Sequence, residues 1–211
     1  LSAEKNIFAA KAGSEQSPKP IIDRYVVLSA AAICLHIMGE TIFSLWLPVF
    51  LMEKIQLSIP EAAISLVMLW FGFAAGRIAI GFIARYLASY KIIFILACVI
   101  FASIIMSFNI LTLATYQYIV VLLGLGLSGM FSLVLAFGNE QVGKPNARLM
   151  TLLTTASSVG GIVGLFLSSF IKAFAAADII LLLAYVFSVV STLCVAIAVL
   201  MRNYSGRVPS A

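Results

Sequence analysis

Charged side chains are scarce in this sequence. Asp, Glu, Lys and Arg make up 10% of its 211 residues and apolar residues make up 63%, whereas roughly a quarter of a soluble domain is ordinarily charged. A soluble fold of this size exposes more polar surface than such a composition can supply. A soluble globular protein is therefore excluded.

Cysteine and histidine are also rare, which limits the chemistry available to the chain. Cys34, Cys98 and Cys194 lie in three different apolar runs without paired spacing, so neither a disulfide framework nor a zinc site is predicted. His36 is the only histidine. The net charge of +5 is not accompanied by a stripe of basic residues with interleaved aromatics, so we expect no nucleic-acid partner. We also expect no metal ion and no cofactor.

Long apolar runs are what the sequence has instead. Crossing a hydrocarbon core about 30 Å thick takes roughly 20 residues of helix. These runs are apolar on every face, whereas barrel strands would be short and would alternate. We therefore expect an all-α, polytopic membrane protein with six transmembrane helices, at approximately residues 25 to 52, 60 to 88, 91 to 111, 116 to 140, 147 to 172 and 177 to 201.

The distribution of Lys and Arg predicts the orientation, because cytoplasmic segments near helix ends retain positive charge. Only Lys54 and Lys172 lie on one side, so both termini are expected in the cytoplasm of a bacterial cell, with the bundle in its cytoplasmic membrane. The domains expected are a cytoplasmic linker at 1–24, a transmembrane bundle at 25–201 and a cytoplasmic tail at 202–211. The basic residues on the other side are Lys5, Lys11, Lys19, Arg24, Arg77, Arg85, Lys91, Lys144, Arg148, Arg202 and Arg207.

Glycines suggest an internal repeat of three helices. The second run of each triplet is glycine-rich, which favours two three-helix repeats of inverted topology. Close packing of helices through small residues alone also accounts for these glycines. They are Gly72, Gly76 and Gly81 in the first triplet, and Gly160, Gly161 and Gly164 in the second.

Glu40 is the ionisable residue nearest the centre of an apolar run. It lies within about 2 Å of the midpoint of the first run, and His36 is one turn earlier on the same face. Placing a charged side chain at this depth in a membrane costs roughly 3 kcal/mol or more, so Glu40 is a candidate functional residue. A carboxylate and an imidazole together can share, accept or release a proton, which suits proton coupling. The alternative is a neutral Glu40 that joins helices by hydrogen bonds.

Two further residues extend this candidate site. Ser44 lies two turns from His36 and shares its face. Arg77 lies within the second run on its cytoplasmic side, where its side chain can extend to the interface or pair with an acid inside the bundle. We expect it to extend to the interface.

An enzymatic alternative comes from the segment 126–129, whose sequence Gly-Leu-Ser-Gly matches the signature of rhomboid intramembrane proteases. Such a protease needs a histidine on its sixth helix to activate Ser128. His36 is on the first run instead, so we expect no enzymatic activity.

The segment from Gly76 to Gly81 has the sequence Gly-Arg-Ile-Ala-Ile-Gly and is followed by Arg85 and Lys91. It resembles the helix-loop-helix signature of the major facilitator superfamily, here between helices eight and nine. Arg85 replaces the usual acidic residue. The resemblance implies a gating or loop motif made of Gly76, Arg77, Gly81 and Arg85.

Other segments resemble the fucose:proton symporter group of sugar permeases within that superfamily. Gly39–Glu40 with Trp46–Pro48 resembles helix seven, Gly124–Phe131 resembles helix ten, and Thr154–Gly164 resembles helix eleven. The resemblance implies the carboxy-terminal half of a twelve-helix transporter, which rocks against an amino-terminal six-helix half. The principal proton-binding acids of the family usually lie in that other half, so Glu40 has substrate binding and bundle stabilisation as alternative roles.

The function expected is secondary active transport of a small polar solute, a sugar being one example, by alternating access and with proton coupling. The polar first 24 residues and the first residue, Leu1, lead us to expect a longer parent chain. Half of a drug-type exporter and a non-transporting membrane scaffold are the alternatives. Expected partners are the solute, the proton, the lipid bilayer and the other half. The lining candidates are His36, Glu40, Ser44, Phe131, Thr154, Thr155, Ser157 and Ser158.

Overall fold

The computed structural model describes residues 24–142 and 147–204, and every element in these ranges is a helix. The predicted linker before Arg24 and the predicted tail after Tyr204 lie outside the described residues. The helices are α2 (Arg24–Ile55), α3 (Ile59–Ile83), α4 (Ser89–Asn109), α5 (Tyr116–Leu127), α6 (Met130–Val142), α7 (Ala147–Lys172) and α8 (Ala177–Tyr204).

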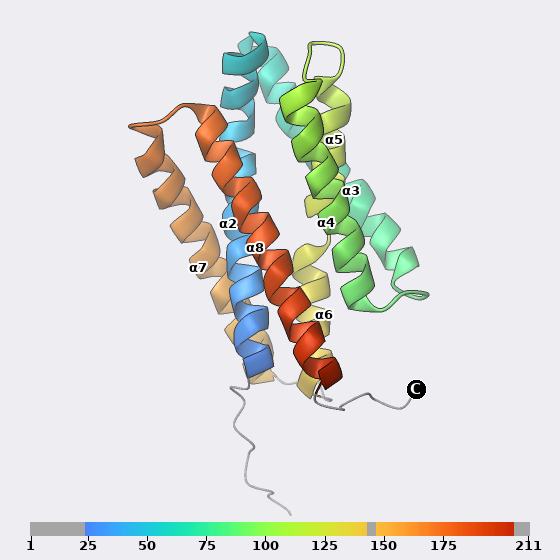
Figure 1. Ribbon diagram of the computed structural model, residues 1–211. Helices are drawn as coiled ribbons and strands as arrows, with labels where there is room; N and C mark the ends of the chain where they lie inside the picture. Colours follow the sequence, from blue (N-terminus) through green and yellow to red (C-terminus); the bar gives the residue numbers. More distant parts are fainter. Residues whose placement is uncertain (1–23, 143–146, 205–211) are drawn as a thin grey trace, which may run out of the picture.

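Six helical stretches within these ranges are long and apolar enough to cross a membrane. The six-span, all-α prediction is therefore confirmed. The second span ends at Ile83, before the predicted residue 88, because the next residues form a turn. The beginning of α2 and the end of α8 lie at the same end of the bundle, as an even number of crossings requires (Figure 1).

The fourth span is broken, whereas the sequence predicted one continuous helix over 116–140. Helix α5 ends at Leu127 and α6 begins at Met130. At the break, the amide of Ser128 bonds to the carbonyl of Leu125 at 3.3 Å, and the Ser128 hydroxyl donates to the same carbonyl at 2.7 Å. A serine hydroxyl competes in this way with the regular helical bonds, which a hydropathy pattern does not reveal.

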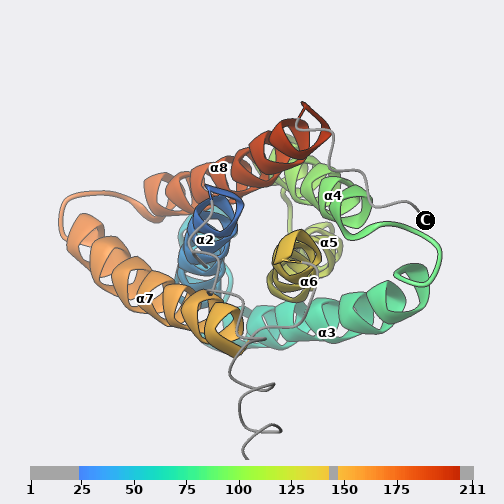
Figure 2. The same ribbon diagram turned by 90° about the horizontal axis from the view of Figure 1, so that it is seen from below.

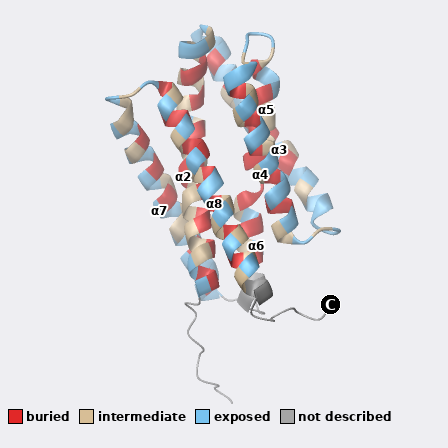
Figure 3. Cartoon of the chain, viewed as in Figure 1, coloured by how far each residue is buried: buried red, intermediate tan, exposed pale blue. Residues whose placement is uncertain are grey.

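The helices form three layers. Viewed along the bundle, α2 and the broken span of α5 and α6 lie between α4 with α8 on one side and α3 with α7 on the other (Figure 2). In the most apolar stretches, 50% of α2 and 61% of the broken span are buried, but only 22% of α3 and of α7. Much of the surface of α7 is exposed (Figure 3). Helices α3 and α7 therefore form the least covered layer.

The helix contacts follow the pattern that two repeated three-helix units predict. Helix α2 packs against α7 and α8, and the broken span packs against α3 and α4 in the corresponding way. The second helix of each predicted triplet packs through glycine against the first helix of the other triplet: Gly76 lies against the side chain of Ser128 on the broken span, and Gly160 lies against the backbone of Cys34 on α2. A small residue at each position allows the two helices this close approach.

Gly160→Ala is expected to destabilise the bundle, whereas Gly161→Ala is not. A Cβ at position 160 would overlap the Cys34 carbonyl, while one at 161 would meet only Ile37 Cγ2 at 3.6 Å and Thr41 Oγ1 at 3.7 Å. Overpacking of this kind costs about 1 to 3 kcal/mol, and both variants gain equally in helix propensity. The melting temperatures of the two detergent-solubilised variants test this. Equal melting would contradict the helix contact.

Ion pairs join the helices at the end of the bundle opposite Arg24. Lys172 on α7 contacts Glu53 on α2, with 2.6 Å between Nζ and Oε1, and the second Glu53 oxygen accepts the amide of Ala177 at 3.2 Å. Lys54 contacts Asp178 at 3.2 Å. The two basic residues expected on this side are thus both paired at the same junction of α2, α7 and α8.

Candidate functional site

Buried polar residues separate the apolar core into two parts. Between the two clusters lie His36 and Glu40 on α2, Ser128 at the helix break, and Ser188 and Ser191 on α8. Helix α2, the helix break and α8 each place polar side chains between the same two apolar clusters, so these side chains form one polar layer across the bundle. The cluster on one side includes Ile33, Met130 and Val195, and the cluster on the other includes Ile42, Leu127 and Tyr185.

His36 and Glu40 lie together, as expected from their spacing. His36 Nε2 and Glu40 Oε2 are 3.7 Å apart, and the side chains are 1% and 19% exposed. That distance is too long for a hydrogen bond, and neither imidazole nitrogen has a hydrogen-bond partner among the described residues. The Leu127 carbonyl lies near the imidazole without reaching hydrogen-bond geometry. A buried polar side chain left unpaired is uncommon and marks a candidate functional site.

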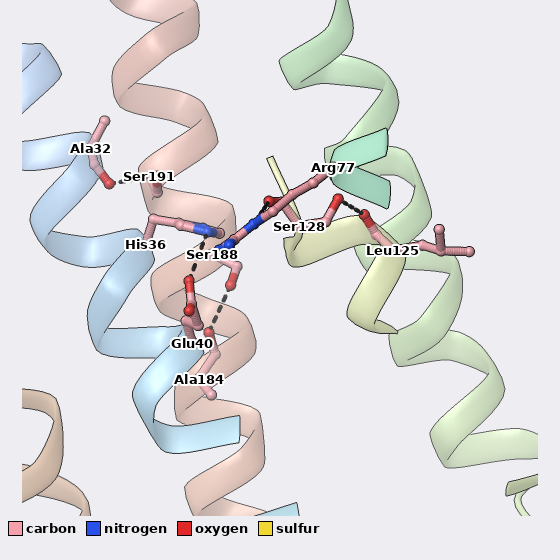
Figure 4. A network of polar contacts seen from close by, with 9 residues as sticks. All are labelled: Ala32, His36, Glu40, Arg77, Leu125, Ser128, Ala184, Ser188 and Ser191. Carbon is pink, nitrogen blue, oxygen red and sulfur yellow. Dashed lines mark hydrogen bonds and ion pairs between the residues drawn. The ribbon is translucent and has the colours of Figure 1, made fainter. Parts of the chain in front are cut away.

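Arg77 is exposed, but its side chain points toward the helix break, which differs from the expectation that it extends to the interface. Its Nε donates to the carbonyl of Ser128 at 3.2 Å, and its Cζ lies 5.7 Å from the centre of the Phe73 ring. Its charge also acts on the Glu40 carboxylate. Figure 4 shows the side chain crossing from α3 toward His36 and Ser188. The reason is local: the helix break leaves a carbonyl within reach, and that carbonyl stabilises the inward conformation.

The helix break itself belongs to the site, which sequence reasoning missed. It turns two backbone carbonyls toward polar side chains, that of Ser128 to Arg77 and that of Leu127 to His36. Broken helices near the bilayer midplane form the binding sites of many transporters, because irregular backbone is tolerated there only where it is buried or lines a cavity. The available signal was the pair of glycines, Gly126 and Gly129, that flank Leu127 and Ser128.

Helix α8 supplies two serines that sequence reasoning also missed. Ser191 donates to the Ala32 carbonyl at 2.7 Å and so ties α8 to α2 (Figure 4). Ser188 donates to Ala184 of its own helix at 3.1 Å and lies against Gly39. The only signal in the sequence was that Ser188 and Ser191 lie at about the same depth in the membrane as Glu40. That depth depends on how α8 aligns with α2.

The remaining predicted lining residues do not converge on His36 and Glu40. Ser44 and Phe131 are half-buried, and Phe131 packs against the core cluster around Ile33. No hydrogen bond or ion pair within the described residues joins the hydroxyls of α7 to His36 or Glu40. Instead, those of Thr154, Ser157 and Ser158 bond to their own backbone, and Thr154, Thr155 and Ser158 are exposed.

The predicted gating motif is dispersed in the structure. Gly76 packs against the broken span, whereas a Cβ at Gly81 would meet nothing within 4 Å. Arg85 is exposed in the turn after α3. Only Gly76 and Arg77 therefore reach the polar layer.

Ser128→Ala is expected to leave the activity of the complete protein nearly unchanged. The Ser128 hydroxyl bonds to Leu125 and faces Gly76, so it is not oriented by a base as a nucleophile must be. The Ser128 carbonyl, which Arg77 binds, is retained in the variant. Solute uptake and peptide cleavage measured side by side check this, and loss of a peptidase activity would restore the protease hypothesis.

No group of three or more His, Cys, Asp and Glu residues that could hold a metal ion occurs in the part of the chain that the structure describes. The polar layer offers one carboxyl, one imidazole, one guanidinium, serine hydroxyls and two carbonyls. Such groups bind polar solutes and exchange protons.

Comparison with known proteins settles the family. The Major Facilitator Superfamily matches residues 4–165, which is more than half of the chain. The chain belongs to this superfamily. Because the superfamily consists of transporters, membership favours transport over the protease alternative. The match does not single out the fucose:proton symporter group, which stays a prediction.

Curated relatives agree with this assignment at modest identity. The chain is similar to Protein TsgA of Escherichia coli O1:K1 / APEC and of Escherichia coli O157:H7 (strain EC4115 / EHEC), and to that of Shigella boydii serotype 18 (strain CDC 3083-94 / BS512). Each is 28% identical over 134 residues, which is 63% of this chain and 33% of the relative. The matching region thus spans about a third of each relative.

Proposed function

We propose that this chain is the carboxy-terminal six-helix half of a proton-coupled secondary transporter, which moves a small polar solute across a bacterial cytoplasmic membrane by alternating access. A sugar is one such solute. The observation that carries this proposal is the His36–Glu40 pair, held 3.7 Å apart in the layer between the two apolar clusters. An acid and an imidazole at this depth can exchange a proton during a transport cycle.

The uneven burial of the helices supports a second bundle as partner. Helices α3 and α7 are the least buried spans, and α7 exposes Thr154, Thr155 and Ser158 in its apolar stretch. Polar side chains within a membrane face the protein interior or a water-filled cavity. This face of α7 therefore fits the surface where the amino-terminal half docks and the solute passes.

Proton movement driven by solute tests the proposed function. The complete transporter, reconstituted in vesicles that contain a pH-sensitive dye, receives D-galactose, sorbitol, glycerol, D-galacturonate, D-gluconate or D-glycerate in turn. A coupled solute is expected to change the internal pH, and a protonophore should abolish that change. Solute entry with no proton movement would contradict proton coupling.

The proposed orientation predicts the labelling of two single cysteines. In a variant without Cys34, Cys98 and Cys194, a cysteine at Ala88 is expected to react from the cytoplasm, and one at Leu113 from the opposite side, because α4 crosses the membrane between them. A membrane-impermeant thiol reagent applied to intact cells and to inverted vesicles measures this. Labelling of both positions from one side would contradict the six-span topology.

A further inference from the structure

The guanidinium of Arg77 is held through its Nε, whereas its two terminal nitrogens have no partner among the described residues. The Nε is bonded to the Ser128 carbonyl, and the Phe73 ring lies beside the guanidinium. Among the described residues, its two terminal nitrogens have no hydrogen bond and no ion pair within 4 Å. An arginine held in this way presents two parallel N–H donors, which is the geometry that binds a carboxylate bidentately.

The charges around Arg77 are few. Glu40 and His36 of α2 are the other ionisable residues in the polar layer, while the helix break and α8 contribute serine hydroxyls and backbone carbonyls. Every other charged residue whose side chain the structure describes lies near a helix end or in a turn. Glu40 acts on Arg77 through its charge but is not within ion-pair distance. Among the described residues, the positive charge of Arg77 therefore has no ion-pair partner, and Arg77 is exposed where a second anion can reach it.

We propose that Arg77 binds a carboxylate of the transported solute, which makes the solute a small hydroxylated organic acid such as a sugar acid. The inference rests on the proposed function, since it names the solute class for the same site. The Arg77 side chain points toward His36 of α2, with Glu40 one turn along that helix and Ser188 of α8 beside them (Figure 4). A neutral sugar would give the guanidinium no negatively charged partner within ion-pair distance.

This arrangement links the solute to the proton. A bound carboxylate beside Glu40 repels its negative charge, so binding of the acid favours the protonated form of Glu40. By linkage, protonation of Glu40 strengthens binding of the acid by the same factor. One anion and one proton then cross together, and the loaded site carries no additional charge.

Matched pairs of solutes, each an acid with its neutral counterpart, test the inference. The complete transporter in detergent is melted with D-glycerate, D-gluconate and D-galacturonate, and with their neutral counterparts glycerol, sorbitol and D-galactose. At least one acid is expected to raise the melting temperature, and its neutral counterpart is not. This comparison uses the unmodified protein, so it does not depend on a variant that folds.

Substitutions then assign the effect to Arg77. Arg77→Gln is expected to weaken binding of the acid about 10- to 100-fold, because a charged hydrogen-bonded pair is lost. Arg77→Lys should lose less, since it keeps the charge but not the paired donors. Lys91→Gln removes an exposed positive charge at the start of α4 and should leave the affinity unchanged. Melting without solute shows whether each variant is folded.

Three results would overturn the inference: no acid binds, a neutral counterpart binds as tightly as its acid, or both Arg77 variants bind the acid as well as the wild type. Its failure is distinguishable from failure of the proposed function. Proton movement driven by neutral solutes alone would preserve the proposed function and reject the acid. Acid binding through Arg77 without proton movement would preserve recognition and reject coupling.

Discussion

In the complete transporter, Glu40→Gln is expected to abolish accumulation driven by a pH gradient while preserving solute exchange. Glutamine keeps the size of the side chain and much of its hydrogen bonding but cannot titrate. With one proton per solute, a gradient of one pH unit corresponds to about 1.4 kcal/mol and sustains about tenfold accumulation. The variant should therefore fall from about tenfold accumulation to equilibration. Driven uptake and exchange of the same labelled solute in vesicles measure this.

Glu61→Gln is the matched control for Glu40→Gln. Glu61 accepts bonds from the amide and hydroxyl of Ser58 at the exposed start of α3, at 2.9 and 2.6 Å. A glutamine side chain can accept the same hydrogen bonds at the start of α3, so this variant should accumulate solute like the wild type. Loss of accumulation in both variants would indicate a general effect of removing a carboxyl group.

Other outcomes at Glu40 assign other roles. If Glu40 only recognises the solute, exchange and driven uptake should lose affinity together, because both require binding. If it only joins helices, Glu40→Gln should be nearly neutral, and Glu40→Ala should lower the melting temperature by leaving partners unsatisfied. Unchanged transport and affinity in both variants would remove Glu40 from the mechanism.

The six-helix chain expressed alone is expected to insert in the membrane and to accumulate no solute. Alternating access requires a second bundle against which this one rocks. The layer of α3 and α7 is poorly covered here, which is where the second bundle should pack. Uptake is measured in vesicles with the six-helix chain, with the complete transporter, and with the two halves expressed as separate chains.

Co-expression of the halves is the control for this experiment, because it should restore uptake if the isolated chain is folded. Uptake by the isolated chain as a monomer would contradict the proposed architecture. Uptake by a homodimer of the chain would require a different architecture, in which two copies of α3 and α7 face each other.

The sequence alone determined the number of spans and the His36–Glu40 pair. Whether a run of residues is apolar and long enough to cross a membrane is a property of consecutive residues. The pair follows from helix geometry, because residues four apart on one helix are neighbours whatever surrounds them. Both features depend on local sequence only, and the structure agrees with both.

Only the tertiary structure decided which residues of different helices share the polar layer. Arg77 and Ser128 are 51 residues apart, and their bond depends on the depth at which α3 meets the helix break. The same holds for Ser191 and Ala32, 159 residues apart. The four candidate hydroxyls of α7 matched the expected composition of a lining, but three of the four lie on exposed residues and none bonds to His36 or Glu40 among the described residues. Alignment between helices is set by packing, such as that of Gly160 on Cys34, and packing is a property of two surfaces together rather than of either sequence segment.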